Sequence, residues 1–212
     1  IARRRLRVSD VQIKAADVKA LRERTGAAMM DCKKALEETG GDTDKAVELL
    51  RVKGQASVAK RSGRSTGEGM VAAYVHARKI GVLVEVQCET DFVARNDIFV
   101  EFVNDLALHI AAANPRVVSA EDIPEEEVAA ERSVFEQKAA EDGKPENVRE
   151  RIVEGQLNKW RKEIALADQV HVNADKHEGK TIEELREEAA GRLGENIRIV
   201  RFARFQLGES DE

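Results

Sequence analysis

Residues 88–97 read Cys-Glu-Thr-Asp-Phe-Val-Ala-Arg-Asn-Asp, and at this stretch an alternating apolar pattern gives way to a helical one. Over residues 82–88 every second side chain is apolar, which predicts a half-buried strand. After the stretch, apolar residues recur at spacings of three and four, and Asn96 or Asp97 can cap the first free N–H groups of a helix. Phe92 is therefore expected in the turn between a strand and a helix.

The residue pattern leaves two orientations open for the Phe92 ring. It can fold back onto the first turn of the following helix as a hydrophobic staple, which is the commoner outcome on pattern alone. Alternatively, it faces outward as a contact residue.

The N-terminal third of the chain predicts three short helices. The first ends at Gly26, since glycine readily adopts the left-handed conformation of a helix stop. An apolar stripe over residues 28–38 predicts the second, and Asp42 or Thr43 can cap the third. Together they predict a small bundle over residues 13–56.

Two segments are predicted to lie outside regular structure on either side of this bundle. Residues 57–68 are rich in Ser and Gly, which is typical of a flexible linker. Residues 1–12 are interpreted as a basic extension that is disordered, because they contain Arg3, Arg4, Arg5 and Arg7.

Residues 69–208 predict an α+β lobe, followed by a short tail over residues 209–212. A strand hairpin comes first, and a strand at the end of the chain is expected to return to it. Between them lie two long amphipathic helices joined by Gly143-Lys144-Pro145, which predict an antiparallel helical hairpin. Its single Trp160 is expected to be buried between these helices.

The final strand has apolar side chains on both faces. Under strict alternation, one face carries Ile197, Ile199, Phe205 and Leu207, and the other carries Val200 and Phe202. Helices of the same chain cover one face, so a second subunit is expected to cover the other. The residues that we assign to this dimer interface are Val200, Phe202 and Phe205.

Composition narrows the possible classes of protein. The 212 residues are 35% charged and 4% aromatic, with a net charge of −5, which excludes an all-β chain and favours helices. Residues 1–67 carry 16 Lys and Arg against 9 Asp and Glu, whereas the remainder carries 19 against 31. A basic N-terminal third raises the alternative of an RNA-binding protein, but acidic residues interrupt its basic ones and aromatic residues are absent between them.

The side chains that could carry chemistry are few. Cys32 and Cys88 lie in apolar patterns without metal-ligand spacing and are interpreted as reduced core thiols of a cytoplasmic protein. His109 is expected to pack or to meet solvent, and no nucleophile stands near a base in a catalytic motif, so no enzyme is predicted. Residues 168–179 are predicted to form an exposed loop without a metal, although they include His171, Asp175, His177 and Glu178. No cofactor is expected, and no apolar run is long enough to span a membrane.

Three motifs of the chain are distinctive. The first is Thr90-Asp91-Phe92-Val93-Ala94-Arg95, and the second, over residues 21–36, reads Leu-Arg-Glu-Arg-Thr-Gly-Ala-Ala-Met-Met-Asp-Cys-Lys-Lys-Ala-Leu. A weaker third is Gly143-Lys144-Pro145 followed by Ile152-Val153-Glu154-Gly155. Together they resemble the elongation factor Ts family of translation factors, and the resemblance covers roughly residues 13–208.

The resemblance implies a bundle of the ubiquitin-associated type, a core lobe, and a guanine-nucleotide exchange factor that binds GDP-bound elongation factor Tu. It implies that Phe92 faces outward and disturbs the Mg²⁺ and nucleotide site of the partner. The exchange contacts would be Thr90, Asp91, Phe92, Val93 and Ala94. The docking contacts of the bundle would be Arg24, Thr25, Gly26, Ala27, Met29, Met30 and Lys33. The residue pattern itself favours one buried methionine and one in an adaptable contact patch with Ala27 and Ala28, and leaves both in the core as the alternative.

This chain departs from many family members, which carry two copies of the α+β lobe, because it has room for only one. A homodimer would supply the second copy, with twofold symmetry. The expected partners are thus elongation factor Tu and a second copy of the chain, without a membrane or direct nucleic acid; a translation-associated RNA-binding protein remains the alternative.

Overall fold

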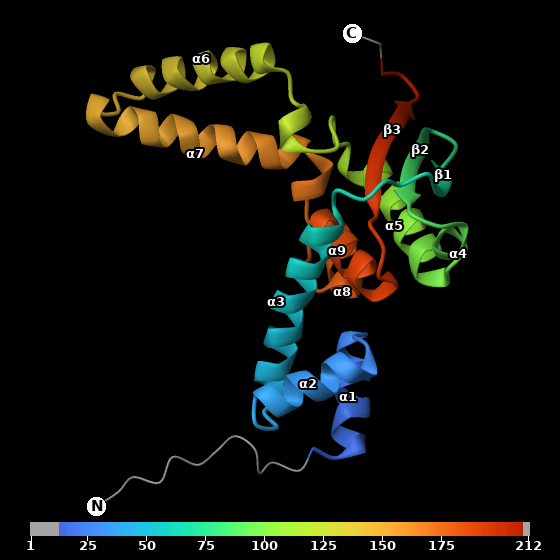
Figure 1. The fold of residues 1–212 in the computed structure, drawn as a ribbon. Helices are drawn as coiled ribbons and strands as arrows, with labels where there is room; N and C mark the ends of the chain where they lie inside the picture. The colour runs from blue at the N-terminus through green and yellow to red at the C-terminus, as the bar shows by residue number, and fades with distance from the viewer. Residues whose placement is uncertain (1–12, 210–212) are drawn as a thin grey trace, which may run out of the picture.

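The computed structural model describes residues 13–209, which form a helical bundle, an α+β lobe and a projecting helical hairpin (Figure 1). The predicted α+β fold class with a small antiparallel sheet is confirmed. The predictions for residues 1–12 and for most of the tail lie outside the described residues.

The bundle consists of α1 (Ala15–Thr25), α2 (Met29–Glu38) and α3 (Thr43–Arg61). Its helices end and begin where the sequence indicates: Gly26 follows α1 with φ +67°, and the side chain of Asp42 caps α3 by accepting from Lys45 N. The apolar stripes of the three helices pack on one another around Val18, Leu21, Cys32, Ala35, Leu36 and Ala46.

The predicted linker over residues 57–68 differs from the structure in its first part. Residues 57–61 continue α3, and Val58 is buried in the core of the lobe. Earlier in α3, the Arg51 guanidinium lies 3.5 Å from Glu184 and Gln55 Nε2 donates to Glu187 at 3.4 Å. Apolar burial at the end of α3 therefore extends the helix through residues whose composition favours a linker.

The sheet has the order β1-β2-β3, with β1 (Glu68–His76) and β3 (Arg198–Gln206) antiparallel to the central β2 (Ile80–Cys88). The hairpin turn places Ala77 and Arg78 at φ +48° and +59°, as tight β-hairpins require. Gly69 is the one strand position that needs a glycine for space, since a Cβ there would come 2.2 Å from the carbonyl oxygen of Val86.

A β-bulge changes which faces the side chains of β3 occupy. Val84 pairs with Phe202 and Val86 pairs with Ile199, so Val200 is the extra residue. The strict alternation expected from the sequence was therefore wrong: Phe202 packs on the core side, as Ile199 does, and Val200 is half-buried at the bulge. Phe205, by contrast, is on the open side and 67% exposed.

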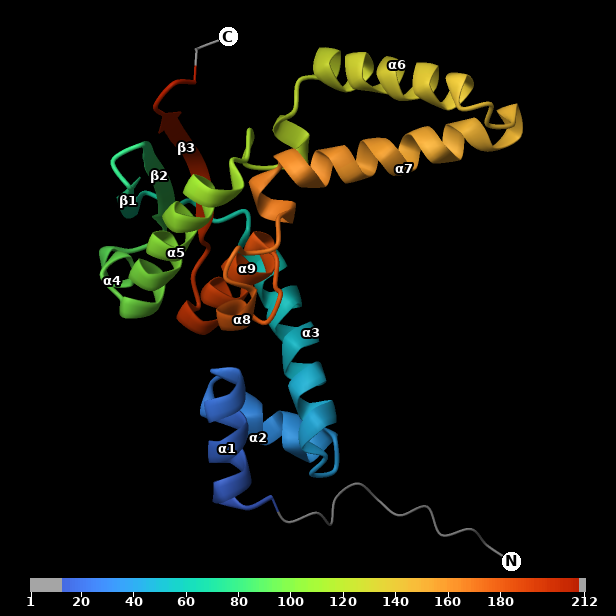
Figure 2. The same cartoon turned by 180° about the vertical axis from the view of Figure 1, so that it is seen from behind.

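Two helices cover the inner face of the sheet. Figure 2 shows α5 (Asp97–Ala113) lying across the strands, with α9 (Ile182–Leu193) beside it. The central strand and α5 bury their apolar residues together, and the largest contributions come from Phe99, Leu106, Ile110, Ile182 and Ile197.

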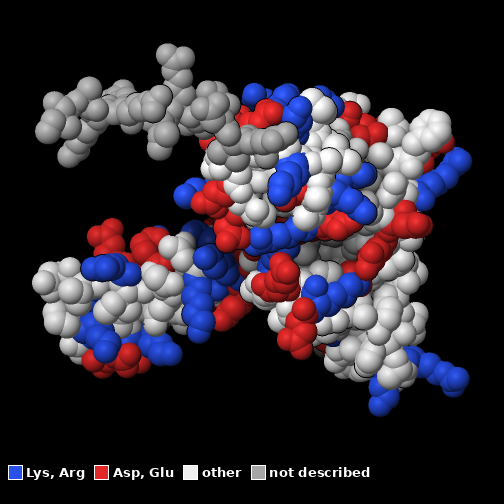
Figure 3. Space-filling view, turned by 90° about the horizontal axis from the view of Figure 1, so that it is seen from below, with Lys and Arg blue, Asp and Glu red and all other residues white. Residues whose placement is uncertain are grey.

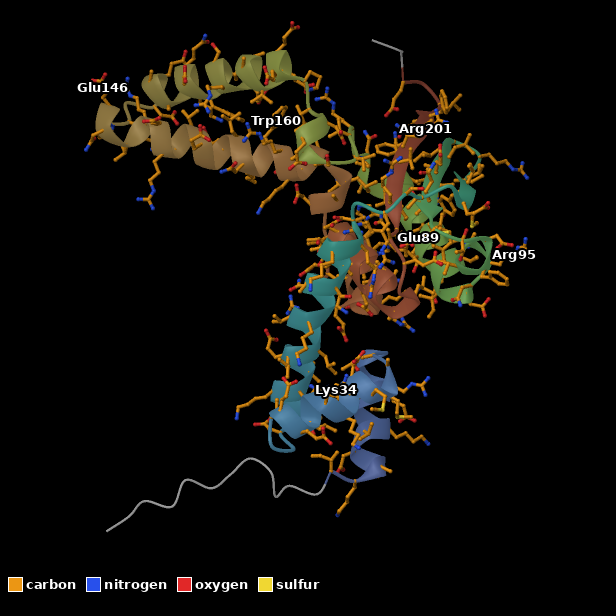
Figure 4. The ribbon with its side chains drawn as sticks, viewed as in Figure 1. Lys34, Glu89, Arg95, Glu146, Trp160 and Arg201 are labelled. Carbon is orange, nitrogen blue, oxygen red and sulfur yellow. The ribbon has the colours of Figure 1, made fainter. Side chains whose placement is uncertain are left out.

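The helical hairpin consists of α6 (Glu125–Glu141) and α7 (Glu146–Ile164), and it extends to the opposite side of the lobe from α4 (Asp91–Ala94) (Figure 1). Its own small core is Ala139, Val153 and Leu157. Trp160 packs against this core from between the two helices but remains half-buried (Figure 4), so its predicted burial is only partial.

Short 3-10 turns at Ala120–Asp122 and Leu166–Asp168 flank the hairpin. The segment after α7 differs most from its prediction, because α8 (Ala174–His177) occupies part of the predicted exposed loop. His171 is 2% exposed and packs between α5 and α8, so the prediction of an exposed loop was wrong at this residue. Among the helices of residues 13–209, none combines the length and apolar composition needed to span a bilayer.

Candidate partner-binding surfaces

Phe92 projects from the one-turn helix α4 at the end of β2. Its side chain is 83% exposed, whereas Val93 and Ala94 beside it pack against the core of the lobe. The exposure contradicts the hydrophobic staple and agrees with the outward orientation. An exposed ring beside partly buried neighbours requires that the backbone of this turn be held, since helices of one turn are unstable by themselves.

Caps at both ends of the turn orient it. Thr90 is the N-cap of α4 and its hydroxyl oxygen accepts from Val93 N at 3.4 Å, while the side chain of Asn96 accepts from Ile98 N at 3.0 Å to begin α5. The Cys88 thiol donates to the carbonyl oxygen of Thr90 at 3.2 Å. The predicted start of the helix at Asn96 or Asp97 is confirmed, and α4 is an additional turn that the sequence pattern does not indicate.

Asp91 forms an ion pair on the protein surface. Its Oδ2 lies 3.0 Å from the guanidinium of Arg95, one helical turn later. Figure 4 shows Arg95 at the outer edge of the lobe. An exposed pair of this kind contributes little to stability, so Asp91 can exchange Arg95 for a partner group at small cost.

The start of α2 presents a second exposed patch. Met29 and Met30 are 45% and 60% exposed, so the expectation that one of them is buried was wrong. Cys32 and Leu36 fill the inner side of α2 instead. Two flexible thioether side chains at a helix start form an adaptable contact surface.

The other predicted docking residues have partners within the fold. Thr25 Oγ1 donates to Leu21 O at 2.7 Å, Arg24 pairs with Asp44 at 2.8 Å, and Lys33 lies 3.8 Å from Glu37. A Cβ on Gly26 would lie 3.0 Å from Arg192, which adds a spatial reason to its positive φ. Ala27 packs against the bundle core. Within this set the two methionines are the residues with large exposed apolar side chains.

The outer face of the sheet is an apolar surface. Cross-strand pairing places Val71, Glu85 and Arg201 in one row, Ala73, Leu83 and Ala203 in the next, and Val75, Gly81 and Phe205 in the third. Arg201 Nε donates to Glu85 at 2.8 Å at one end of this face. Val71, Leu83, Val75 and Phe205 are all half or more exposed, and no helix of residues 13–209 covers them.

Comparisons with known proteins agree with the geometry. The family described as Elongation factor TS matches residues 11–209. The chain belongs to the elongation factor Ts family. Elongation factor Ts of Geobacter sulfurreducens is 52% identical over 203 residues, covering 95% of this chain and 93% of that protein. The homologue of Solidesulfovibrio magneticus is 51% identical over 198 residues, covering 93% and 98%, and that of Thermoanaerobacter sp. is 51% identical over 201 residues, covering 94% and 97%.

Membership of the elongation factor Ts family gives the chain a role in translation elongation and confirms the resemblance read from its motifs. Each motif is exposed in part: the Phe92 turn and the methionines at the start of α2 lie on the surface. Sequence reasoning missed Glu195 and Asn196 in the loop between α9 and β3: the side chain of Glu195 accepts from the base of the Phe92 turn, and the backbone N–H of Asn196 donates to Glu89. Their only sequence signal is the preceding Gly194, which predicts a helix end and nothing about contacts a hundred residues away.

Three of the four histidines of the lobe form a structural cluster. The ring centroid of His171 lies 5.2 Å from that of His109 and 4.1 Å from that of His177. His109 Nδ1 accepts from Val172 N at 3.1 Å and its Nε2 donates to Gln169 Oε1 at 2.9 Å, which assigns the tautomer. Burial in the apolar core lowers the pKa of His109 to about 4, and burial also lowers the pKa of His177.

These side chains and the two cysteines do not form a reactive centre. Over residues 13–209, no group of three or more His, Cys, Asp and Glu side chains has an arrangement that could hold a metal. Burial, and secondly the negative charge of Glu195, raises the pKa of the Cys88 thiol to about 11, which keeps it protonated and weakly nucleophilic. Cys32 is buried in the bundle core.

Proposed function

We propose that this protein binds GDP-bound elongation factor Tu and promotes the release of GDP and its exchange for GTP. The observation that carries the proposal is the exposed ring of Phe92, held out from a turn whose Val93 and Ala94 pack partly buried against the core, within a motif of the elongation factor Ts family. In this proposal the protein performs no covalent chemistry and acts in the cytoplasm, where translation takes place.

The mechanism is differential binding. The protein binds its partner more tightly when GDP and Mg²⁺ are loosened, and reciprocity requires that GDP weaken the complex by the same factor. An acceleration of about ten-thousandfold corresponds to about 5.5 kcal/mol of differential binding. Burying one large apolar side chain contributes roughly 1.5–3 kcal/mol, so Phe92 must act together with other contacts.

Two surfaces of the protein contact the partner, the Phe92 turn and the start of α2. Asp91 and Phe92 enter the partner near its Mg²⁺ site, where Phe92 displaces helices that hold the nucleotide. Met29 and Met30 dock on the nucleotide-binding domain of the partner through the start of α2, and this grip supplies affinity without acting on the nucleotide itself. The exposure of both methionines supports the second role.

A homodimer forms through the open face of the sheet. In this dimer the apolar rows centred on Leu83 and Phe205 of two copies face each other across a twofold axis, which removes several exposed apolar side chains from water. Phe205 remains in this interface, whereas Phe202 belongs to the core of the lobe and Val200 to the bulge. A second lobe then reaches the partner, as in family members with two copies.

RNA binding is the weaker candidate. Figure 3 shows basic and acidic side chains interspersed over the face that it presents, without a continuous basic stripe. RNA-binding surfaces combine such stripes with exposed aromatic residues, and the exposed phenylalanines here lie on surfaces that the exchange proposal already uses.

The deciding experiment is release of a fluorescent GDP analogue from elongation factor Tu, with and without this protein at increasing concentration. We expect faster release that saturates with protein concentration. An unchanged release rate would contradict the proposal, and a salt-dependent shift of labelled RNA by the isolated protein would then favour the RNA-binding alternative.

A further inference from the structure

The carboxylate of Glu195 accepts three hydrogen bonds from the base of the Phe92 turn. Its Oε2 accepts from the backbone N–H groups of Glu89 and Thr90, both at 3.0 Å, and its Oε1 accepts from the hydroxyl of Thr90 at 2.6 Å. Glu195 comes 105 residues after Thr90 and lies directly beyond the end of α9. Hydrogen bonds to an ionised carboxylate are shorter and stronger than neutral ones, so this is the strongest attachment of the turn.

The Thr90 hydroxyl couples this attachment to α4. Because its hydrogen is donated to Glu195, its oxygen lone pairs face the other way and accept from Val93 N. That second bond is the N-cap of α4. Glu195 therefore fixes the orientation of the Thr90 hydroxyl group. Through this hydroxyl it also holds the start of the helical turn that carries Phe92.

Asn196, the next residue in the same loop, contacts both Glu89 and the segment that follows α3. Glu89 Oε1 accepts from Asn196 N at 2.7 Å, and Asn196 Nδ2 donates to the carbonyl oxygens of Ser62 and Arg64 at 3.1 and 2.9 Å. Figure 4 shows Glu89 nearer the centre of the lobe than Arg95. The loop 194–196 is in contact with both the Phe92 turn and the segment that follows α3.

A four-residue helix needs such support. Its few backbone hydrogen bonds do not offset the entropy of ordering the chain, and the exposed Phe92 side chain adds no burial of its own. The packing of Val93 and Ala94 anchors the far end of the turn, while Glu195 anchors the near end. Both anchors are required to aim the Phe92 side chain in one direction.

We propose that Glu195 is the positioning residue of the Phe92 turn, and that it raises exchange activity by holding the turn ordered before the partner binds. Preorganisation lowers the entropy cost of inserting Phe92 into the partner. Because we assign docking to the start of α2 and nucleotide displacement to Phe92, this effect belongs to the limiting rate of exchange. The functional half of this inference rests on the proposed exchange function. The structural half, that Glu195 orders the turn, concerns the isolated protein.

The test compares Glu195→Gln with the matched control Glu184→Gln. Glutamine removes the negative charge and keeps only one acceptor oxygen, so the three donors of the turn no longer share a charged acceptor. Glu184 accepts from the N–H and hydroxyl of Thr181 through one oxygen, Oε2, at the start of α9, and its Oε1 lies 3.5 Å from Arg51. The control therefore removes the same negative charge from a helix cap away from Phe92.

Amide hydrogen exchange of the isolated protein decides the structural half. In Glu195→Gln we expect the amides of Glu89 and Thr90 to exchange about tenfold faster, the ratio that follows from losing one charged hydrogen bond, and no such change in Glu184→Gln. Equal protection of these amides in both variants would overturn the inference. If Glu195→Gln does not fold, Thr90→Val removes the hydroxyl end of the same bond and is measured in its place.

Release of fluorescent GDP decides the functional half. Glu195→Gln should lower the limiting release rate about tenfold with an unchanged half-saturation concentration, and should add little to Phe92→Ala in the double variant. A full effect on top of Phe92→Ala, or an unchanged limiting rate, would overturn this half. If Phe92→Ala by itself leaves release unaffected, the proposed exchange role fails, while the amide measurement still decides whether Glu195 orders the turn.

Discussion

The ring of Phe205 lies on the open face of the sheet opposite Gly81, where the glycine leaves space beside it. Phe202, three residues earlier, packs against the core on the other face. Because the two phenylalanines have opposite surroundings, the same substitution should have different consequences at the two positions.

Phe205→Glu should leave the lobe folded and convert the proposed homodimer to monomers, because a carboxylate in the proposed apolar interface loses the burial of a large ring and remains unpaired. Sedimentation equilibrium at micromolar concentration measures the mass. Val134→Glu introduces the same charge at an exposed position of α6 and should not change the mass. A wild-type mass near the 23.5 kDa of one chain would contradict pairing through this face.

Phe92→Ala should lower the limiting rate of GDP release by roughly tenfold to a hundredfold, the ratio that corresponds to the burial of one large apolar side chain in the partner. The melting temperature should stay close to that of the wild type, since the ring is exposed. Val134→Ala truncates another exposed side chain as a control. Wild-type release rates with Phe92→Ala would exclude the ring as the exchange wedge.

Met29→Glu should raise the half-saturation concentration of the protein about tenfold while leaving the limiting rate of GDP release nearly unchanged, because the start of α2 supplies docking rather than nucleotide displacement. A titration of release rate against protein concentration separates the two parameters. Val52→Glu, at an exposed position of α3, is the control within the bundle. An unchanged half-saturation point for Met29→Glu would show that this patch does not bind the partner.

The stability of the lobe should fall below pH 6.5 because of His109. Its pKa is about 4 in the fold and 6.5 in the unfolded chain, so the unfolded state binds the proton first as the pH decreases. The free energy of unfolding should therefore decrease between pH 6.5 and pH 4, by about 3 kcal/mol from this group. Below pH 4 this contribution should level off.

Urea unfolding at pH 7 and pH 4.5 measures this dependence. His109→Gln should have a smaller difference between the two pH values than the wild type, although its absolute stability is lower. His76→Gln, at an exposed position of β1, should retain the wild-type difference. Equal pH dependence in the wild type and in His109→Gln would mean that His109 does not titrate as the buried site predicts.

Local interactions and apolar spacing were sufficient to predict much of this protein. The period-two pattern of residues 82–88, the cap at Asn96, and the stops at Gly26 and Gly194 act within a few residues of one another, so the sequence determines them without the rest of the fold. The motif around Phe92 likewise determined the family.

Tertiary contacts decided the remainder. The bulge at Val200 depends on pairing with β2, the burial of His171 depends on α5, and α3 continues through residues 57–61 because Val58 reaches the core of the lobe. The bonds from Glu195 to Thr90 join residues 105 positions apart. No periodicity encodes such contacts, since they form only when distant segments lose their chain entropy together in the folded state.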